Sequence, residues 1–343
     1  MKNDNPIKGF SVDLQTVQFT GKDLQRPECI LAEPDGSIWA ADARGGVVHI
    51  HPDGKQSIIT QKYDTVGINP SADTNRFFEG TLPNGLAFAE NGDIYISNFG
   101  TDCLEIMKRT GETKVLLDNV DGKEIGKVNF VLRDSKDRLW ITISTMRKNW
   151  LTAIVPDLAD GYIIRYDSRG VAIVADGLHF TNEIRFDEKE EFLYVVETTG
   201  KRILRYRVDN NGDLHNKEIF GPSDLGIGGF PDGIAFDSYG NLWGTLIMAD
   251  RIFVITPDGE LVILIDEGDK EKVENLEKAF QASGVTSEIL FETGRGIAPW
   301  MASVTFGQAD LKTLYIGSLR GTTIPYFKTP VAGLPMVHWK KKQ

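Results

Sequence analysis

One phrase of hydrophobic and polar positions repeats along this chain: a polar residue, a short apolar run, a tight turn, and then an aromatic residue inside a second apolar run. The polar residue, called the anchor below, precedes the aromatic residue by 11 or 12 positions. Six copies can be traced, with anchor and aromatic at Glu28 and Trp39, Asn84 and Tyr95, Asn129 and Trp140, Asn182 and Tyr194, Asp232 and Trp243, and Ser303 and Tyr315. Strand-sized runs joined by Asp-Gly or Asn-Gly turns predict a β-hairpin for each phrase.

A second hairpin often follows the first, as at 47–60 around Pro52-Asp53-Gly54 and at 251–262 around 257–259. Four short strands in every roughly fifty residues are typical of a propeller blade, and six blades close into a ring. The sequence therefore predicts an all-β fold, a six-bladed β-propeller with four-stranded blades and a short helical insertion, as a single domain over 1–343.

The ring needs a closure, because an open ring would leave two bare sheet edges. The alternating segment 10–19 is suited to supply the outer strand of the blade that 314–327 completes. Extra length falls at 62–82, 144–160, 220–230 and 266–298, which we interpret as loops over one mouth. Within the last of these, 269–283 predicts an exposed helix with Val273, Leu276 and Phe280 on one stripe.

Composition narrows the class of ligand. The 49 Asp and Glu residues outnumber the 38 Lys and Arg residues, giving a net charge of −11, which disfavours nucleic acid as a partner. No apolar run reaches the length of a membrane span, and the polar start MKNDNP carries no signal-peptide pattern. Cys29 and Cys103 have no metal-binding or disulfide spacing. We therefore expect a cytoplasmic protein that binds a small molecule and neither nucleic acid nor membrane. Its oligomeric state stays open.

Equivalent positions in the blades of a propeller lie on a ring around its axis, so the anchors are expected to face one another at the mouth of the channel. Two carboxylates, Glu28 and Asp232, would then meet three carboxamides and a serine. The carboxylates repel each other, and a divalent cation such as Ca²⁺, Mg²⁺ or Mn²⁺ suits an all-oxygen set. Taken singly, an Asn or Asp before Gly is more often a turn residue. Polar identity at all six positions is what favours a shared site.

Several of these phrases resemble the senescence-marker-protein/gluconolactonase (regucalcin-like) family, and the resemblance runs from about residue 26 to 327. They are Arg26-Pro27-Glu28, Lys127-Val128-Asn129, Thr181-Asn182 and Phe230-Pro231-Asp232-Gly233. The resemblance implies a six-bladed propeller with one catalytic divalent cation in its channel, Ca²⁺ first, with Mg²⁺, Mn²⁺, Zn²⁺ or Fe²⁺ as the other ions. It implies Glu28, Asn182 and Asp232 as metal ligands, Asn129 beside both metal and substrate, and Asp232 as the general base.

Such a site would hydrolyse a lactone or related ester to a hydroxy acid, which places the protein among the carboxylic ester hydrolases. Two positions depart from the family pattern. Phe130 follows Asn129 where many relatives have Asp, and Glu183 follows Asn182 where Gly is common. Both departures argue against a plain sugar lactone as the substrate.

Five further residues are candidates for the substrate site. Asn84 could orient the substrate or complete the coordination of the metal. Arg44 could reach a carboxylate or hydroxyl, or equally pair with Asp42 at the surface. Met146 and Trp150 in the 144–160 insertion, and Trp300 before the last anchor, could contact an apolar substrate. Packing is the commoner role of such side chains.

Two rival functions remain. A strictosidine-synthase-like propeller would catalyse without a metal and would need an acid elsewhere, for which Glu292 is a candidate. A non-catalytic propeller would only bind Ca²⁺ or a small ligand. Two carboxylates on the channel axis favour the metal-dependent lactonase. No Gly-x-Ser-x-Gly or His-Glu-x-x-His motif occurs, which excludes the usual serine-hydrolase and zinc-protease patterns.

Overall fold

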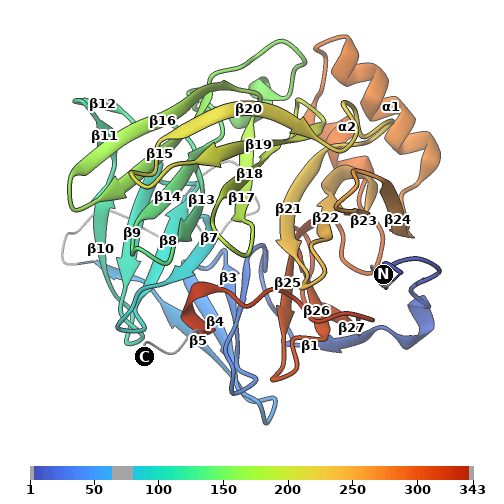
Figure 1. Ribbon diagram of the computed structural model, residues 1–343, viewed down its shortest axis with the longest axis horizontal. Coiled ribbons are helices and arrows are strands. Elements are labelled where there is room, and N and C mark those ends of the chain that lie inside the picture. The colour runs from blue at the N-terminus through green and yellow to red at the C-terminus, as the bar shows by residue number, and fades with distance from the viewer. Residues whose placement is uncertain (1–3, 64–79, 340–343) are drawn as a thin grey trace.

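The computed structural model describes residues 4–63 and 80–339, and it confirms the predicted architecture. Six antiparallel sheets surround a central axis as a six-bladed β-propeller (Figure 1). The innermost strands are β2 (Ile30–Ala32), β7 (Pro83–Phe88), β13 (Val128–Arg133), β17 (Thr181–Phe186), β21 (Pro231–Phe236) and β25 (Met301–Gly307). Each contacts the next in this order, and β25 contacts β2, which completes the ring. Each anchor except Glu28 lies within one of these innermost strands, and Glu28 lies just before β2.

The first three blades follow the chain from the inside outward. Blade 1 consists of β2 (Ile30–Ala32), β3 (Ile38–Asp42), β4 (Gly46–Ile50) and β5 (Gln56–Thr60). Blade 2 consists of β7 (Pro83–Phe88), β8 (Ile94–Asn98), β9 (Cys103–Met107) and β10 (Glu112–Leu117), with β6 (Lys62–Tyr63) added parallel to β10. Blade 3 consists of β13 (Val128–Arg133), β14 (Leu139–Ile143), β15 (Gly161–Asp167) and β16 (Gly170–Leu178). A small hairpin, β11 (Asn119–Val120) and β12 (Lys123–Glu124), connects blades 2 and 3.

Blades 4 and 5 keep the same order, whereas blade 6 takes its outer strand from the N-terminal part of the chain. Blade 4 consists of β17 (Thr181–Phe186), β18 (Phe192–Glu197), β19 (Arg202–Val208) and β20 (Leu214–Phe220). Blade 5 consists of β21 (Pro231–Phe236), β22 (Leu242–Leu246), β23 (Arg251–Ile255) and β24 (Leu261–Asp266). Blade 6 consists of β25 (Met301–Gly307), β26 (Thr313–Ser318), β27 (Ile324–Lys328) and β1 (Gln18–Thr20).

The ring is closed by β1, which pairs antiparallel with β27 from Gln18 opposite Tyr326 to Thr20 opposite Ile324. This strand is much shorter than the predicted 10–19. A 3₁₀ helix, η1 (Leu14–Thr16), precedes it and interrupts the alternation that the sequence displays. The closure therefore has three ladder positions, and the residues before it pack on the blades by their side chains.

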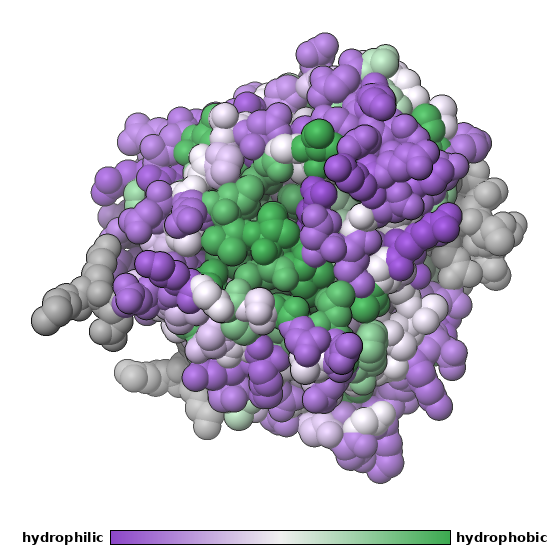
Figure 2. Space-filling model, turned by 90° about the vertical axis from the view of Figure 1, so that its right-hand side faces the viewer, coloured by the Kyte–Doolittle hydropathy of each residue, from purple (hydrophilic) through white to green (hydrophobic). Residues whose placement is uncertain are grey.

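Figure 2 shows the side of the molecule that carries the N-terminal segment and the outer strand of blade 5, with hydrophobic side chains gathered in its middle. Ile7 and Val17 are buried in the core shared by blades 5 and 6, and Phe10 meets the edge of Trp243 with ring centroids 6.3 Å apart. Leu14 and Phe19, by contrast, are 41% and 51% exposed. Burial of Ile7 and Val17 adds apolar stabilisation to the short closing strand.

The residues after β27 form a second connection across the ring, which we call the C-terminal strap (329–339). It leaves blade 6, pairs at Gly333 with Asp237 of blade 5, and ends at the 3₁₀ helix η4 (Val337–Trp339). There the side chains of His338 and Trp339 both bond to the carbonyl oxygen of Ala32 in blade 1, each at 2.8 Å. In Figure 1 this segment, in red, crosses in front of the centre of the ring.

Both α-helices of the described residues lie in the insertion 266–298. The predicted helix is α1 (Lys270–Gln281), which begins where the Asp269 side chain accepts a hydrogen bond from Lys272 N, and its apolar stripe is buried. A second helix, α2 (Ser287–Glu292), follows it. Two 3₁₀ helices, η2 (Trp150–Ala153) and η3 (Ile247–Ala249), lie in loops. Within the described ranges no helix is long and apolar enough to cross a membrane. Most of the predicted insertion 62–82 lies outside the described residues.

The repeated aromatic residue has a structural role in each phrase where it is tryptophan. Its indole N–H donates to the carboxylate six residues earlier: Trp39 to Glu33 at 2.6 Å, Trp140 to Asp134 at 2.9 Å, and Trp243 to Asp237 at 2.8 Å. A buried indole needs such a partner. In these three phrases the acidic residue before the turn is therefore part of the repeat, and its hydrogen bond links the first strand of the blade to the second.

Candidate metal centre and substrate cavity

The anchors meet at a cavity at one end of the central channel. Seven polar residues line it and are called the polar floor below: Arg26, Glu28, Asn84, Asn129, Asn182, Thr198 and Asp232. Five of the six predicted anchors are among them. The sixth, Ser303, is buried outside the lining, and its hydroxyl donates to the backbone carbonyl of Glu28. Ser303 therefore holds Glu28 in place and is not itself part of the floor.

The innermost strands change register where they carry their anchors. The ladder shifts between Pro83 and Leu86 in β7, between Val128 and Phe130 in β13, between Thr181 and Ile184 in β17, and between Pro231 and Ile234 in β21. A bulge of this kind places an extra residue in one strand and re-aims its side chain. Each floor residue supplied by these four strands lies within such a shift.

The glycines that follow two anchors are explained by strand packing and not by turns. Asn84-Gly85 and Asp232-Gly233 lie inside β7 and β21. A Cβ atom on Gly85 would lie 2.6 Å from the Cα of Phe130 in the neighbouring inner strand, and one on Gly233 would clash with Ser303. These glycines allow the inner strands to approach closely around the axis. The simple turn interpretation of these two anchors therefore fails.

Asn84 ties three blades together at the floor. Its Nδ2 donates to Glu28 Oε1 at 3.1 Å and to the carbonyl oxygen of Asn129 at 3.0 Å. Its Oδ1 accepts a hydrogen bond from Arg26 Nη2 at 2.6 Å. With its donors and its acceptor engaged in this way, the Asn84 side chain fixes the positions of its neighbours in blades 1 and 3.

Two buried oxygens of the floor have no hydrogen-bond partner among the described residues: Glu28 Oε2 and Asn182 Oδ1. The Asn182 nitrogen donates to Thr198 Oγ1 at 3.1 Å, and that hydroxyl donates to the carbonyl oxygen of Pro231 at 2.8 Å. These two hydrogen bonds orient the Asn182 amide and leave its Oδ1 available. Buried acceptors without partners are costly, and coordination of a cation would satisfy both.

The carboxylates of the floor are difficult to ionise in this environment. Burial raises the pKa of Glu28 to about 8, although the nearby Arg26 lowers it. Burial first and repulsion from Glu28 second raise the pKa of Asp232 well above its usual value. A divalent cation would relieve both effects, and an all-oxygen donor set suits a hard ion. The described residues contain no cluster of three or more His, Cys, Asp or Glu side chains for a metal, so amide oxygen must complete this set. The residues present fit such an ion.

Two residues of the floor, Arg26 and Thr198, were not predicted from the sequence as site residues, and Arg26 is the charged one. Its side chain is 7% exposed, its backbone has φ of +56°, and its Nε has no partner among the described residues. Its guanidinium attracts the charged forms of both Glu28 and Asp232. A non-glycine residue in the left-handed region is strained, and such strain clusters at functional sites. The motif Arg26-Pro27-Glu28 was visible in the sequence, but nothing in its spacing shows that the arginine reaches the channel.

A buried ion pair lies beneath the floor. Glu183, which stands where Asn84 and Asp232 are followed by glycine, is fully buried and lies 2.9 Å from Arg185 Nη2. The guanidinium of Arg185 stacks over the ring of Phe130 at 4.6 Å. Burial raises the pKa of Glu183 to about 7 despite Arg185, and Glu183 in turn raises the pKa of both floor carboxylates. The departure from Asn-Gly at this anchor therefore places a third carboxylate on the axis.

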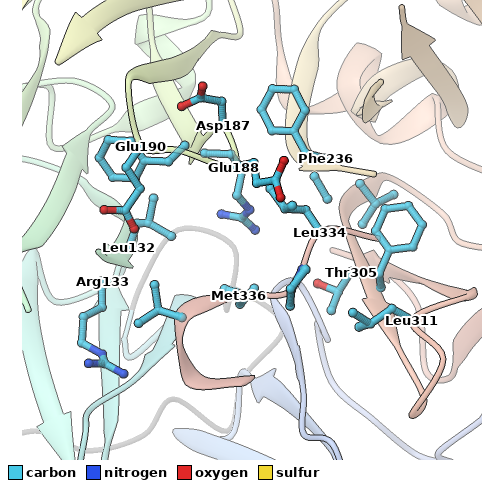
Figure 3. Close-up of a pocket in the computed structure, with 17 residues that line it drawn as sticks. Leu132, Arg133, Asp187, Glu188, Glu190, Phe236, Thr305, Leu311, Leu334 and Met336 are labelled. Carbon is cyan, nitrogen blue, oxygen red and sulfur yellow. The ribbon is translucent and has the colours of Figure 1, made fainter. Parts of the chain in front are cut away.

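Arg185 also lines a second cavity that the C-terminal strap borders (Figure 3). Figure 3 shows Leu334 and Met336 of the strap lying across from Asp187 and Glu188 of blade 4. Within the described part of the chain, this second cavity shares no lining residue with the cavity above the polar floor, and Arg185 lines only the second of them.

An apolar wall rises from the polar floor. Four aromatic residues contribute to it: Phe99, Trp150, Phe180 and Trp300. Four aliphatic or thioether side chains complete it: Ile154, Ile247, Met248 and Leu319. Of these eight wall residues, only Trp150 and Trp300 were predicted from the sequence. The others come from loops whose paths the sequence does not specify.

Three candidates lie outside the cavity lining. Arg44 makes a bidentate pair with Asp42, with both N–O distances 2.7 Å, as the surface alternative described. Met146 is 44% exposed. Glu292 lies at the end of α2 and pairs with Lys272 at 3.2 Å, so the structure gives the metal-independent alternative no acid in the cavity at this position.

The ring of blades and its oxygen-rich floor define a six-bladed propeller with a polar site in its central channel. The chain belongs to the SMP-30/Gluconolactonase/LRE-like region family, whose sequence profile matches residues 61–270. This membership confirms the resemblance seen in the sequence.

Two curated relatives illustrate the range of this family. The 6-deoxy-6-sulfogluconolactonase of Pseudomonas putida is 26% identical over 232 residues, which are 67% of this chain and 66% of that protein. The adipocyte plasma membrane-associated protein of Homo sapiens is 29% identical over 174 residues, 47% of this chain and 40% of that protein. The chain thus spans about half the length of the curated relatives it matches.

Solved structures share the fold at low identity. A luciferin-regenerating enzyme aligns with a TM-score of 0.68 and 16% identity over 94% of this chain and 98% of its own. Regucalcin from Agrobacterium tumefaciens, described as a calcium-binding protein, aligns with a TM-score of 0.62 and 17% identity over 92% of this chain and 95% of its own. At this identity the likeness establishes the fold alone.

Proposed function

We propose that this protein is a metal-dependent lactonase, which hydrolyses a cyclic ester to a hydroxy acid. The observation that carries the proposal is the polar floor, where two buried carboxylates from blades 1 and 5 share a cavity with an amide oxygen and two of these oxygens lack partners. The lactonase named among the relatives supports the same reaction class.

Glu28, Asn182 and Asp232 would hold the divalent cation, with Asn129 beside it. We propose Ca²⁺ first, with Mg²⁺, Mn²⁺, Zn²⁺ or Fe²⁺ as the alternatives, because oxygen ligands accept several ions. When bound, such a cation polarises a lactone carbonyl and stabilises negative charge on its oxygen.

The remaining steps belong to side chains of the floor. Asp232 accepts the proton of the water that attacks the carbonyl carbon, since its carboxylate lines the cavity beside the position proposed for the cation. The ring C–O bond then breaks and its oxygen takes up a proton, which gives the hydroxy acid. Arg26 holds a positive charge beside the reacting group and stabilises negative charge that develops there. Asn129 orients the substrate, and Asn84 fixes Arg26 and Glu28.

The test measures metal content and lactone hydrolysis together. We expect about one divalent ion per wild-type chain, loss of hydrolysis after chelation, and recovery when the ion is restored. Asp232→Ala should lose both the ion and the activity, whereas the control Asp53→Ala, which removes an exposed carboxylate outside the cavity, should retain both. A chain that binds no ion and hydrolyses lactones, or an Asp232→Ala variant with full activity, contradicts the proposal.

A further inference from the structure

The wall and the floor of the cavity differ completely in chemistry. Every hydrogen-bonding side chain among the described residues that line the cavity lies in the floor, apart from the two tryptophans of the apolar wall. The indole N–H of Trp300 is already bonded to Thr293 Oγ1 at 3.0 Å. A ligand seated on the floor therefore meets hydrocarbon and aromatic surface on its sides.

The apolar wall is a built surface with its own packed support. Its buried members belong to one hydrophobic cluster that also contains Leu276 and Phe280 of α1 and Leu290 of α2. The rings of Phe291 and Trp300 lie 5.0 Å apart, and the wall is joined to blade 5 through Phe230, whose ring lies 5.0 Å from that of Phe280. Because packed side chains of this kind do not rearrange freely, the shape of the cavity is largely preformed.

Such a wall discriminates between substituents of a substrate. The hydroxyl groups of a sugar lactone that face the wall would lose water on entry and meet hydrocarbon and aromatic carbon, and lost hydration is costly for each group. Among the described side chains of the wall only Trp150 and Trp300 carry an N–H, and that of Trp300 is bonded to Thr293. An alkyl or aryl substituent gains by leaving water, and each buried methylene is worth about a fourfold change in binding. The side chains of the wall and the floor line one and the same cavity, so a single ligand can contact both.

We infer that the substrate is a lactone that carries an apolar alkyl or aryl substituent, and not a polyhydroxylated sugar lactone. This inference rests on the proposed function, because the ester group must lie on the polar floor for its substituent to reach the wall. Trp150 and Met248 would contact the substituent, from the 144–160 insertion and from η3 respectively.

The first experiment compares hydrolysis of substrates by the metal-loaded protein. The probes are γ-lactones with side chains of increasing length, the aryl lactone dihydrocoumarin, and glucono-δ-lactone. We expect kcat/KM to rise about fourfold with each methylene until the cavity is filled, and to be lowest for the gluconolactone. A flat series, or a preference for gluconolactone, overturns the inference and leaves the lactonase proposal standing.

The second experiment measures binding without turnover. Lactams with the same side chains resist hydrolysis, and calorimetry gives their Kd with and without Ca²⁺. We expect Kd to fall with chain length. If no lactone is hydrolysed but lactam binding still strengthens with chain length, the proposed function fails while the class of ligand stands. If the Kd of the lactams does not change with the length of their side chain, the inference is overturned whether or not lactones are hydrolysed.

Two substitutions in the same insertion locate the effect. Trp150→Gln should reduce the preference for the longest side chain at least about tenfold, because it places an amide in the wall. The matched control Met146→Gln changes an exposed side chain outside the cavity lining and should leave the preference as in the wild type. Equal preferences in the two variants overturn the assignment of the wall. Met248→Gln gives a second test should Trp150→Gln fold poorly.

Discussion

The guanidinium of Arg26 donates from Nη2 to Asn84 Oδ1 at 2.6 Å, and this bond holds a cation beside the two carboxylates of the channel. The same amide donates to Glu28 at 3.1 Å. One asparagine therefore sets the distance between a positive and a negative group that would otherwise pair directly. This arrangement keeps an oxygen of Glu28 free for another partner.

Replacing Arg26 should move metal affinity and turnover in opposite directions. Arg26→Gln removes a positive charge next to the ligands, so a divalent ion should bind more tightly. Loss of the charge that stabilises the reacting group should lower kcat by about 10- to 100-fold, with a smaller effect on KM. Calorimetry with Ca²⁺ and steady-state kinetics measure the two effects. Arg44→Gln is the control, and weaker metal binding in Arg26→Gln would contradict this role.

Asp232→Asn should stabilise the metal-free protein while abolishing its response to metal. Burial and repulsion raise the pKa of both floor carboxylates, so the folded state without metal loses stability as pH rises from their ordinary values through the raised ones. Removing one charge should raise the free energy of unfolding in chelator at pH 8 by about 1–2 kcal/mol. Ca²⁺ at 100 times its Kd should add about 2.7 kcal/mol to the wild type and nothing to the variant. Equal Ca²⁺ responses would argue against Asp232 as a ligand.

The C-terminal strap should make the fold sensitive to mild acid. Burial lowers the pKa of His338 to about 4, and the neutral ring bonds to the carbonyl oxygen of Ala32. The unfolded chain therefore binds a proton between about pH 6.5 and 4 that the folded chain does not, so the stability present above pH 6.5 is lost as pH falls. The loss is at most about 3 kcal/mol.

Urea unfolding at pH 7 and pH 5 measures this effect. The wild type should lose more stability between the two pH values than His338→Gln does. His215→Gln changes an exposed histidine on β20 and should keep the wild-type pH dependence. Identical pH dependence in all three proteins would show that the strap does not carry the effect.

The N-terminal closure should depend on one buried side chain more than on the exposed ones around it. Ile7 is 1% exposed, and Ile7→Ala should cost about 2–4 kcal/mol of unfolding free energy through the lost contacts and the cavity. Leu14→Ala removes a side chain that is 41% exposed and should cost about 0.5 kcal/mol or less. Thermal unfolding of the two variants checks the difference. Similar costs would mean that the segment before β1 contributes little to closure.

The repeat in the sequence was sufficient to predict the ring and the meeting of its anchors, because equivalent positions in a closed ring must face a common axis. Glu28 and Asp232 are 204 positions apart in the sequence, yet both line the same cavity. The sequence could not show the register shifts that carry these anchors, since a bulge depends on the pairing partner. Nor could it show that Gly85 and Gly233 serve strand packing.

What the pattern missed depends on backbone conformation and on loops. Arg26 reaches the floor from a left-handed backbone that no residue preference signals, and the aliphatic side chains of the wall come from connections of irregular length. The strand predicted at 10–19 shortened to β1 because η1 takes up the residues before it. Local alternation alone did not distinguish a strand from a segment that packs by scattered side chains.

The position of the Glu183–Arg185 pair has a kinetic consequence. Glu183 is fully buried, Arg185 lines only the second cavity, and the two cavities have no lining residue in common among the described residues. We therefore expect no passage from the polar floor to the second cavity. Substrate must then enter, and the hydroxy acid must leave, through the same end of the channel. The hydroxy acid should therefore compete with substrate as a product inhibitor. The rate should then fall early in the progress curve as the hydroxy acid accumulates.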